Sequence, residues 1–243
     1  MAASSRIDDL SPDSLSSRAT RLCRSAPAGS IIDLRNLLAE RFPQPFTPSV
    51  FRLATGLPAI DDVIGGGLPK SAITELSSPH VSAGSALLLY ALLQSAQRAG
   101  NFLALVDGRD SFDPSAFGGL GRGRLGNLLW VRCSKALEAI KAADLLLRDG
   151  NFPLVVLDLV LNASSELRKI PQTSWYRLQR LVETAPTAFL VLTRASIISS
   201  AQLKLSLDNA WNLADLEKDH LTARLKILVK RAQGGKQAIA GAG

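Results

Sequence analysis

Between about residue 50 and residue 194, short continuous apolar runs alternate with longer amphipathic stretches. Continuous apolar runs are typical of strands buried on both faces, and amphipathic stretches are typical of helices. This order predicts an α/β fold: a mainly parallel sheet with helices on both faces. The predicted strands are residues 73–76, 102–106, 128–131, 154–157 and 188–192, and the predicted helices are residues 85–99, 134–148 and 174–184, with Ser134 as a cap.

After Arg194 the helical pattern fades, and two more strands are predicted, over residues 203–213 and 221–229. In the second of these, apolar residues alternate with basic ones, which is the pattern of a half-buried strand. The apolar positions are Leu225, Ile227 and Val229. We expect these strands to form antiparallel additions at the C-terminal edge of the sheet.

The chain divides into four predicted segments. Residues 1–29 are rich in Ser, Ala, Arg and Asp without periodicity, which indicates a flexible N-terminal arm. Residues 30–49 contain a short helical pattern and then a proline-rich linker, because prolines at 43, 45 and 48 cannot continue a helix. Residues 50–233 form the predicted core domain, and residues 234–243 are a flexible tail.

Composition narrows the function only slightly. The formal net charge of +7 permits a polyanionic partner without requiring one. Cys23 and Cys133 lie far apart and His80 and His220 are the only histidines, so we expect no metal site. No apolar run reaches the roughly 18 residues of a membrane span, and no signal peptide is evident, so we expect a cytoplasmic protein without a membrane partner.

Candidate chemistry lies where parallel strands end, since ligands of open parallel sheets bind beyond the carboxyl ends of the strands. Three such ends are the turn after Leu76, Asp107 and Asp158. An Asp after a buried strand either holds Mg²⁺ indirectly, as in phosphate-loop proteins, or caps the next turn. Both interpretations of Asp158 remain open from the sequence.

Three segments in order resemble the core of the RecA family. Residues 55–76 carry a Thr-Gly pair, an Asp, a Gly-Gly-Gly-Leu-Pro turn and a strand with a Glu. Residues 106–114 resemble the family's second strand and its following loop, and residues 150–158 resemble its Walker B strand. The resemblance covers roughly residues 50–233 and implies a RecA-like phosphate-loop core.

The resemblance also exposes three departures. The family's phosphate loop needs a lysine followed by Ser or Thr, but residues 78–86 contain no lysine. Arg109 aligns with the catalytic glutamate, and a cation cannot act as a base. Thr193 and Arg194 stand where the family has a γ-phosphate-sensing glutamine. We therefore expect no catalytic residue, no cofactor and no ATP hydrolysis. Weak binding of ATP or another anion stays open, and the residues for it are Ser82, Gly84, Ser85 and Asp158.

Basic residues indicate where DNA or a partner protein could bind. The loop after the Walker B strand faces DNA in RecA-like folds, and it carries Arg168 and Lys169. A second set lies near the C-terminus: Arg224, Lys226, Lys230 and Arg231. Residues 51–54 match the F-x-x-A pattern by which recombinases dock on one another. This pattern is short, and an ordinary strand leading into Thr55 is the favoured interpretation.

The chain is similar to the bacterial ImuA (SulA-like) group of damage-induced mutagenesis proteins. The similarity rests on the missing loop lysine, the basic C-terminal strand and the Gly-Gly tail. That resemblance implies a non-catalytic adaptor in translesion mutagenesis whose partners are a recombinase and a Y-family polymerase-like protein. Two alternatives are a RecA-like DNA-dependent ATPase or recombinase paralogue with an atypical phosphate loop, and a DNA-binding module. Self-association also stays open.

Overall fold

The computed structural model describes residues 51–80, 84–115, 125–212 and 224–232. Tertiary contacts divide the chain at residue 49, and the described residues all belong to the second unit. The predicted arm, the helix and linker of residues 30–49, and the tail of residues 234–243 lie outside the described residues. Ser82 lies outside them as well.

Seven of the described strands form one sheet, in the order β5-β4-β6-β7-β3-β8-β9. All neighbouring pairs run parallel except β8 with β9. The central strands are almost entirely buried, which explains their continuous apolar sequences. The strands span β3 Ala72–Ser77, β4 Leu103–Asp107, β5 Leu128–Arg132, β6 Leu154–Asp158, β7 Ala188–Thr193, β8 Leu203–Leu207 and β9 Ile227–Ala232.

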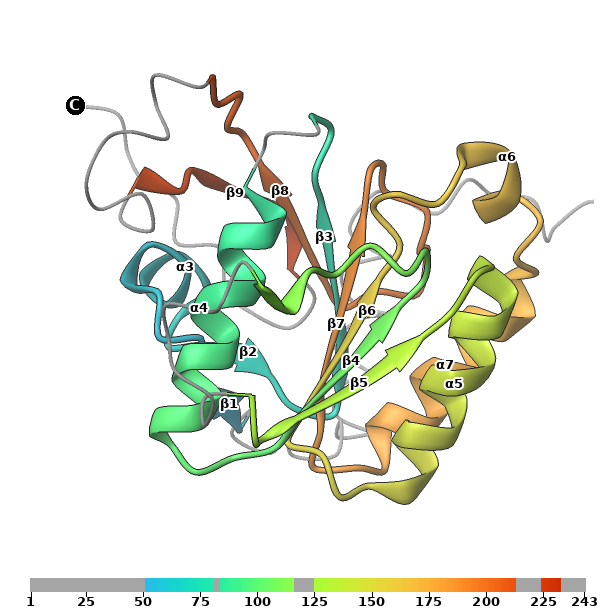
Figure 1. The fold of residues 1–243 in the computed structure, drawn as a ribbon, viewed down its shortest axis with the longest axis horizontal. Helices are drawn as coiled ribbons and strands as arrows, with labels where there is room; N and C mark the ends of the chain where they lie inside the picture. The colour runs from blue at the N-terminus through green and yellow to red at the C-terminus, as the bar shows by residue number, and fades with distance from the viewer. Residues whose placement is uncertain (1–50, 81–83, 116–124, 213–223, 233–243) are drawn as a thin grey trace, which may run out of the picture. The chain divides into compact units, whose positions relative to one another are not determined.

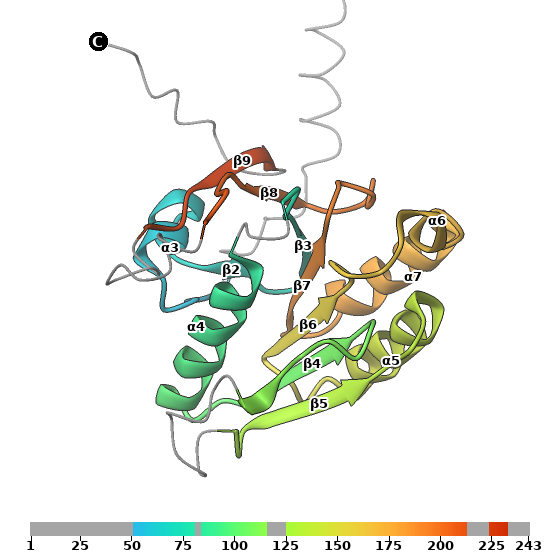
Figure 2. The ribbon, with the colours of Figure 1, turned by 45° about the horizontal axis from the view of Figure 1, so that its top comes forward.

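Helices cover both faces of this sheet (Figures 1 and 2). On one face lie α3 (Pro58–Ile64) and α4 (Ser85–Arg98), and on the other lie α5 (Ala136–Asp149) and α7 (Gln172–Glu183), with the short α6 (Ser164–Leu167) at its edge. Alternate residues of the central strands β4, β6 and β7 contribute to two separate apolar cores, one under each layer of helices. In α7 the buried side chains recur at helical spacing: Trp175, Leu178 and Val182. The predicted α/β architecture is therefore confirmed.

A two-stranded ribbon precedes β3. It pairs β1 (Arg52–Leu53) with β2 (Leu68–Pro69) in antiparallel fashion. Gly67 adopts a φ of +128°, and a Cβ there would lie 2.3 Å from the carbonyl oxygen of Leu53. The backbones approach so closely that only glycine fits, which explains the glycine-rich turn before β3.

The C-terminal strands differ in detail from their predictions. β8 ends at Leu207 rather than continuing to residue 213, and it runs parallel to β3. Asp208 and Asn209 end it, and both residue types are disfavoured in strands. β9 begins at Ile227, and its antiparallel pairing with β8 confirms the predicted antiparallel edge. The alternation fails at Val229, which is 41% exposed because this side of the edge strand is uncovered among the described residues.

The cap predicted for α5 is wrong. This helix begins at Ala136, and the side chain of Ser134 does not cap it. Instead, the carboxylate of Glu166 accepts a hydrogen bond from the backbone N–H of Ala136 at 2.6 Å. A residue thirty positions downstream thus satisfies the helix N-terminus, which local sequence rules cannot foresee.

Candidate functional site

The carboxyl ends of four adjacent parallel strands bring the predicted site residues together. Ser77 pairs with Thr193, and Asp107 pairs with Asp158 across neighbouring strands. α4 begins directly above this edge, in the first layer of helices (Figure 1). The structure therefore places the predicted residues Gly84, Ser85, Asp158 and Thr193 at the same end of the sheet.

The N-terminus of α4 is the position of the missing lysine. Gly84 is its N-cap and has a φ of +101°, and no side chain of a described residue caps the helix. A Cβ on Gly84 would lie 2.7 Å from a methyl carbon of Leu225 and 4.0 Å from Nε1 of Trp211. The backbone N–H groups of this terminus favour an anion, but an apolar side chain from the distant C-terminal segment packs against Gly84.

Asp107 organises the loop that follows β4. Its carboxylate accepts hydrogen bonds from the backbone N–H groups of Arg109, Ser111 and Phe112, at 3.2, 2.7 and 2.7 Å. With only 1% of its surface exposed, Asp107 is committed to these bonds. Its position therefore has a structural explanation that requires no ligand.

Asp158 occupies the end of β6. Its Oδ1 accepts a hydrogen bond from the backbone N–H of Val160 at 2.9 Å. Asp158 therefore caps the turn after β6, which is the second of the two interpretations given for it from the sequence. Burial, assisted by the nearby charge of Asp107, raises the pKa of Asp158 to about 6. The carboxyl is therefore partly protonated just below neutral pH.

The three altered positions do not converge on one atom. Arg109 is exposed, and its guanidinium donates to the carbonyl oxygen of Ser134 at 3.2 Å, toward the start of α5. Thr193 is fully buried, and its hydroxyl has no hydrogen-bond partner among the described residues. Arg194 is exposed in the loop after β7.

Loops after different strands are held together by a network that the sequence did not reveal. Asn162 Nδ2 donates to the carbonyl oxygen of Gly108 at 2.9 Å and to Glu166 at 3.3 Å. A Cβ on Gly108 would lie 2.5 Å from Asn162 Oδ1, so only glycine fits at this position of the loop after β4. Through Glu166 the network continues to α5, so it ties the loops after β4 and β6 to the start of this helix.

The comparisons with known proteins agree with this architecture. A family model described as the RecA N-terminal domain matches residues 41–170, more than half of the chain. The chain belongs to the RecA N-terminal domain family. It is 34% identical over 148 residues to Protein RecA of Clavibacter michiganensis, a match that covers 60% of this chain and 38% of that relative.

Two further relatives give the same result. The chain is 34% identical over 114 residues to Protein RecA of Frankia alni, covering 46% of this chain and 32% of the relative. It is 37% identical over 109 residues to Protein RecA of Acidothermus cellulolyticus, covering 44% and 31%. The RecA-family chain thus spans about a third of the length of the curated relatives it matches.

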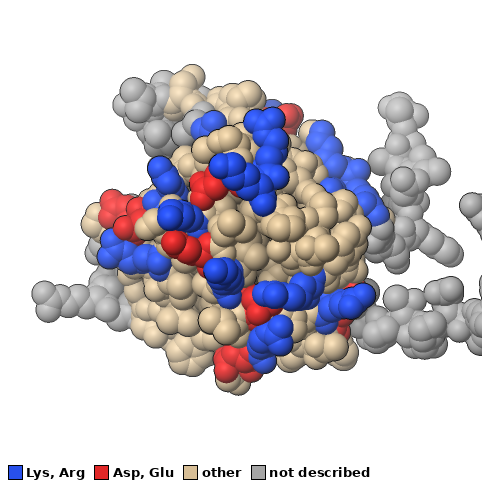
Figure 3. All heavy atoms as spheres, turned by 90° about the vertical axis from the view of Figure 1, so that its right-hand side faces the viewer, with Lys and Arg blue, Asp and Glu red and all other residues tan. Residues whose placement is uncertain are grey.

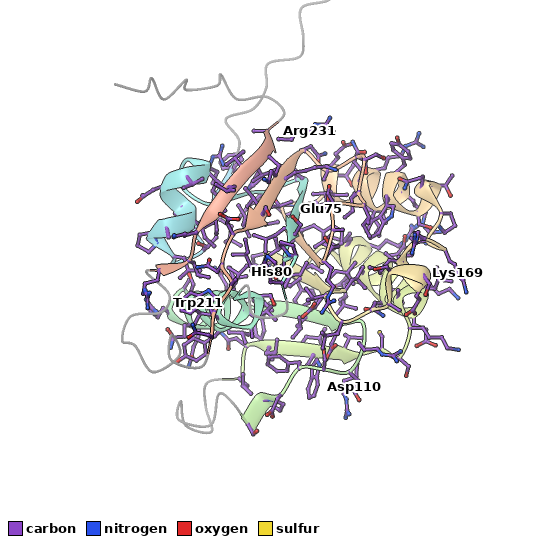
Figure 4. The ribbon with its side chains drawn as sticks, turned by 90° about the horizontal axis from the view of Figure 1, so that it is seen from above. Glu75, His80, Asp110, Lys169, Trp211 and Arg231 are labelled. Atoms are coloured by element: carbon purple, nitrogen blue, oxygen red, sulfur yellow. The ribbon has the colours of Figure 1, made fainter. Side chains whose placement is uncertain are left out.

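The basic residues of this RecA-family chain fall into two separate groups. Lys169 lies beside α6, whereas Arg231 lies at the far end of β9 (Figure 4). Arg168 donates to the carbonyl oxygen of Ser164 at 3.2 Å, and both Arg168 and Lys169 are exposed. On the face that carries α5, α6 and α7, cationic and acidic side chains are interspersed (Figure 3). That face therefore presents mixed charge rather than a single basic surface.

The F-x-x-A segment of the RecA-family chain forms the start of the ribbon. Arg52 and Leu53 make β1, in agreement with the favoured strand interpretation. Phe51 is 73% exposed. Within the part of the chain that the structure describes, no group of three His, Cys, Asp or Glu side chains could hold a metal ion, and no helix is long and apolar enough to cross a membrane.

Trp130 and Trp211 lie outside the predicted site residues. Trp130 is only partly buried, packing edge-on against Phe112 at 5.3 Å beneath the guanidinium of Arg132. Arg132 also binds Asp110 through two hydrogen bonds, and this contact lowers the pKa of Asp110. Trp211 was hidden within an overlong predicted strand, and the Asp-Asn pair before it was the available signal that the strand ends.

Proposed function

We propose that this RecA-family chain is a non-catalytic adaptor of the DNA-damage response, which binds a recombinase and a Y-family polymerase-like protein during translesion mutagenesis. The observation that carries the proposal is the composition of the α4 N-terminus. No lysine or arginine occurs in the sequence from Ser71 to Gln97, and Leu225 packs against Gly84 where the helix begins.

The chemistry of phosphoryl transfer explains why this composition matters. Catalysis depends on cations that neutralise the charge developing on the β- and γ-phosphates, and on a group that orients the attacking water. At the start of α4 no lysine or arginine is available to neutralise the phosphates. At the position of the group that would orient the water stands Arg109, whose guanidinium donates to the carbonyl oxygen of Ser134. The loss of one charge-stabilising group costs roughly 10²–10³ in rate. The residues present do not fit a reacting triphosphate.

The likeness to the ImuA group supports the choice of partners. A RecA core that does not hydrolyse ATP keeps the outer surfaces of the fold, so it can still bind to a recombinase. The tied loops at the carboxyl edge favour such a role, because a rigid surface binds with a smaller loss of conformational entropy.

The first prediction concerns ATP hydrolysis. Purified protein is expected to release no more phosphate from ATP than its Asp158→Asn variant, with or without single-stranded DNA, because neither has a lysine or arginine at the start of α4. Phosphate release measured beside an active RecA control checks this expectation. Hydrolysis above background that is abolished by Asp158→Asn would establish the ATPase alternative and reject the adaptor.

The second prediction concerns capture of partners from cells with damaged DNA. Tagged chain is expected to recover the recombinase or the polymerase-like protein, identified by mass spectrometry. The Asp158→Asn variant should recover them equally, since it leaves the backbone unchanged and no nucleotide is needed. Any shortened chain used to locate the partner-binding region should end after Ala232. Leu225 and Ile227 are buried in the core, so removing them would damage the fold. Recovery of neither partner with the full chain would contradict the proposal.

A further inference from the structure

A hollow of about 400 Å³ opens where β8 ends, beside the first residues of the C-terminal strand. Residues 208–211 form one wall and residues 224–226 form the other. Its volume is in the range of sites that accept a small ligand or an inserted side chain. None of the proposed adaptor's chemistry explains this hollow.

The two walls are held together before any partner arrives. Asn209 Nδ2 donates to the carbonyl oxygen of Arg224 at 3.1 Å, and its Oδ1 accepts from the backbone N–H of Lys226 at 2.8 Å. The backbone N–H of Asp208 also donates to the carbonyl oxygen of Lys226 at 2.9 Å. A pre-formed hollow binds more tightly than one that must be ordered on binding.

The lining combines an aromatic ring with a cation. The guanidinium of Arg224 lies 5.7 Å from the centre of the Trp211 ring. Nε1 of Trp211 is buried without a hydrogen-bond partner among the described residues, and Leu225 completes the apolar part. An apolar or aromatic side chain fits such a lining, because tryptophan and arginine are the residues that most often anchor protein interfaces.

The surroundings of the hollow are strongly basic. The described residues of 203–212 and 224–232 contain one acid, Asp208, and four exposed cations: Arg224, Lys226, Lys230 and Arg231. Trp211 lies at one end of this basic group, near α4, and Arg231 lies at the other (Figure 4). Leu228 and Val229 are 44% and 41% exposed between the cations. No described strand pairs with the outer edge of β9.

We propose that the hollow and β9 together bind an acidic segment of a partner protein, which inserts one apolar side chain beside Trp211 and places carboxylates along the cations. Charge complementarity selects the acidic character. The exposed aliphatic side chains and the open strand edge favour a polypeptide over nucleic acid, which would need further stacking residues where Leu228 and Val229 stand. The inference rests on the proposed adaptor function, since it names the chemistry of one of the adaptor's partners.

Fluorescence anisotropy of a labelled synthetic peptide tests the inference. The probe is a short peptide with a central Phe-Leu pair between acidic residues. The protein is expected to bind it, and Trp211→Ala should raise its Kd about tenfold. Lys226→Gln combined with Lys230→Gln should raise the Kd about threefold per charge at low salt. The matched control, Lys141→Gln with Arg180→Gln, removes two exposed cations from α5 and α7 and should leave the Kd unchanged.

Three further probes decide between interpretations. A peptide with Gly-Gly at its centre should bind much more weakly, and one with lysines in place of the acids should not bind. Equal binding of the Gly-Gly peptide, or equal binding by the Lys226/Lys230 variant, would overturn the inference. Tighter binding of a short oligothymidylate that displaces the peptide would do so as well, by identifying a nucleic-acid surface. These results are independent of recombinase capture, so failure here and failure of the adaptor function are distinguishable.

Discussion

Replacing Glu75 with glutamine is expected to lower the free energy of unfolding by about 3 kcal/mol. Glu75 is 1% exposed in the centre of β3. Its Oε1 accepts from the backbone N–H groups of Ile197 and Ile198 at 2.6 and 3.0 Å. Its Oε2 accepts from the hydroxyl of Ser196 at 2.8 Å and lies 3.2 Å from the ammonium of Lys204. All of these groups donate to the carboxylate, and of them only the Ser196 hydroxyl can also accept.

Glutamine has nearly the shape of glutamate but carries an NH₂ group on one side. In one orientation that group faces the backbone N–H groups of Ile197 and Ile198, and in the other it faces the ammonium of Lys204, so at least one buried bond becomes a contact between two donors. Urea denaturation monitored by circular dichroism measures the loss. Lys204→Met provides the comparison, and it should cost about 1 kcal/mol because Glu75 keeps three other partners and Lys204 is partly exposed. A Glu75→Gln variant within about 0.5 kcal/mol of the natural chain would contradict this account.

Replacing Asp158 with asparagine is expected to raise the free energy of unfolding at pH 7.5 by about 2 kcal/mol. The pKa of this carboxyl is raised to about 6 in the folded chain, against a usual value near 3.8. The folded state therefore holds the proton more tightly than the unfolded state. The contribution of this carboxyl to stability is greatest below about pH 4, falls as the pH rises to about 6, and stays reduced above it.

The full pKa shift corresponds to about 3 kcal/mol, but the side chain is partly exposed, which reduces the effect. Asparagine keeps the oxygen that accepts from Val160 and removes the charge. Denaturation of both proteins at pH 4 and pH 7.5 measures the difference, and the variant should gain stability relative to the natural chain at pH 7.5 but not at pH 4. Asp62→Asn, at an exposed position of α3, serves as the control and should change neither value. A destabilised Asp158→Asn protein at pH 7.5 would contradict the prediction.

The sequence was most informative where local pattern and burial coincide. β4, β6 and β7 read as apolar runs because they are buried on both faces, and α7 reads as a helix because its buried residues recur at helical spacing. The sequence was less informative where distant residues decide. Glu166 replaces Ser134 at the start of α5, and no local rule predicts a cap from another loop.

The candidate site divides in the same way. The absence of a cation between Ser71 and Gln97 is visible in the sequence, but the residue that packs at Gly84 is not. Leu225 reaches that position because β8 pairs with β3 and β9 pairs with β8; the edge strands were predicted, but the contact of Leu225 with Gly84 has no local signal. The hollow at Trp211 arises from the same arrangement, so pattern analysis treated its residues as ordinary strand.

The position of β3 between β7 and β8 has a consequence for synthesis of the chain. Both partners of β3 emerge from the ribosome more than a hundred residues later, so its two edges wait unpaired while the intervening segments are made. Unpaired apolar strands promote aggregation, and a charge within the strand opposes it. During that interval Glu75 places an acidic side chain in the middle of β3, and the loop after β7 that covers it is synthesised more than a hundred residues later.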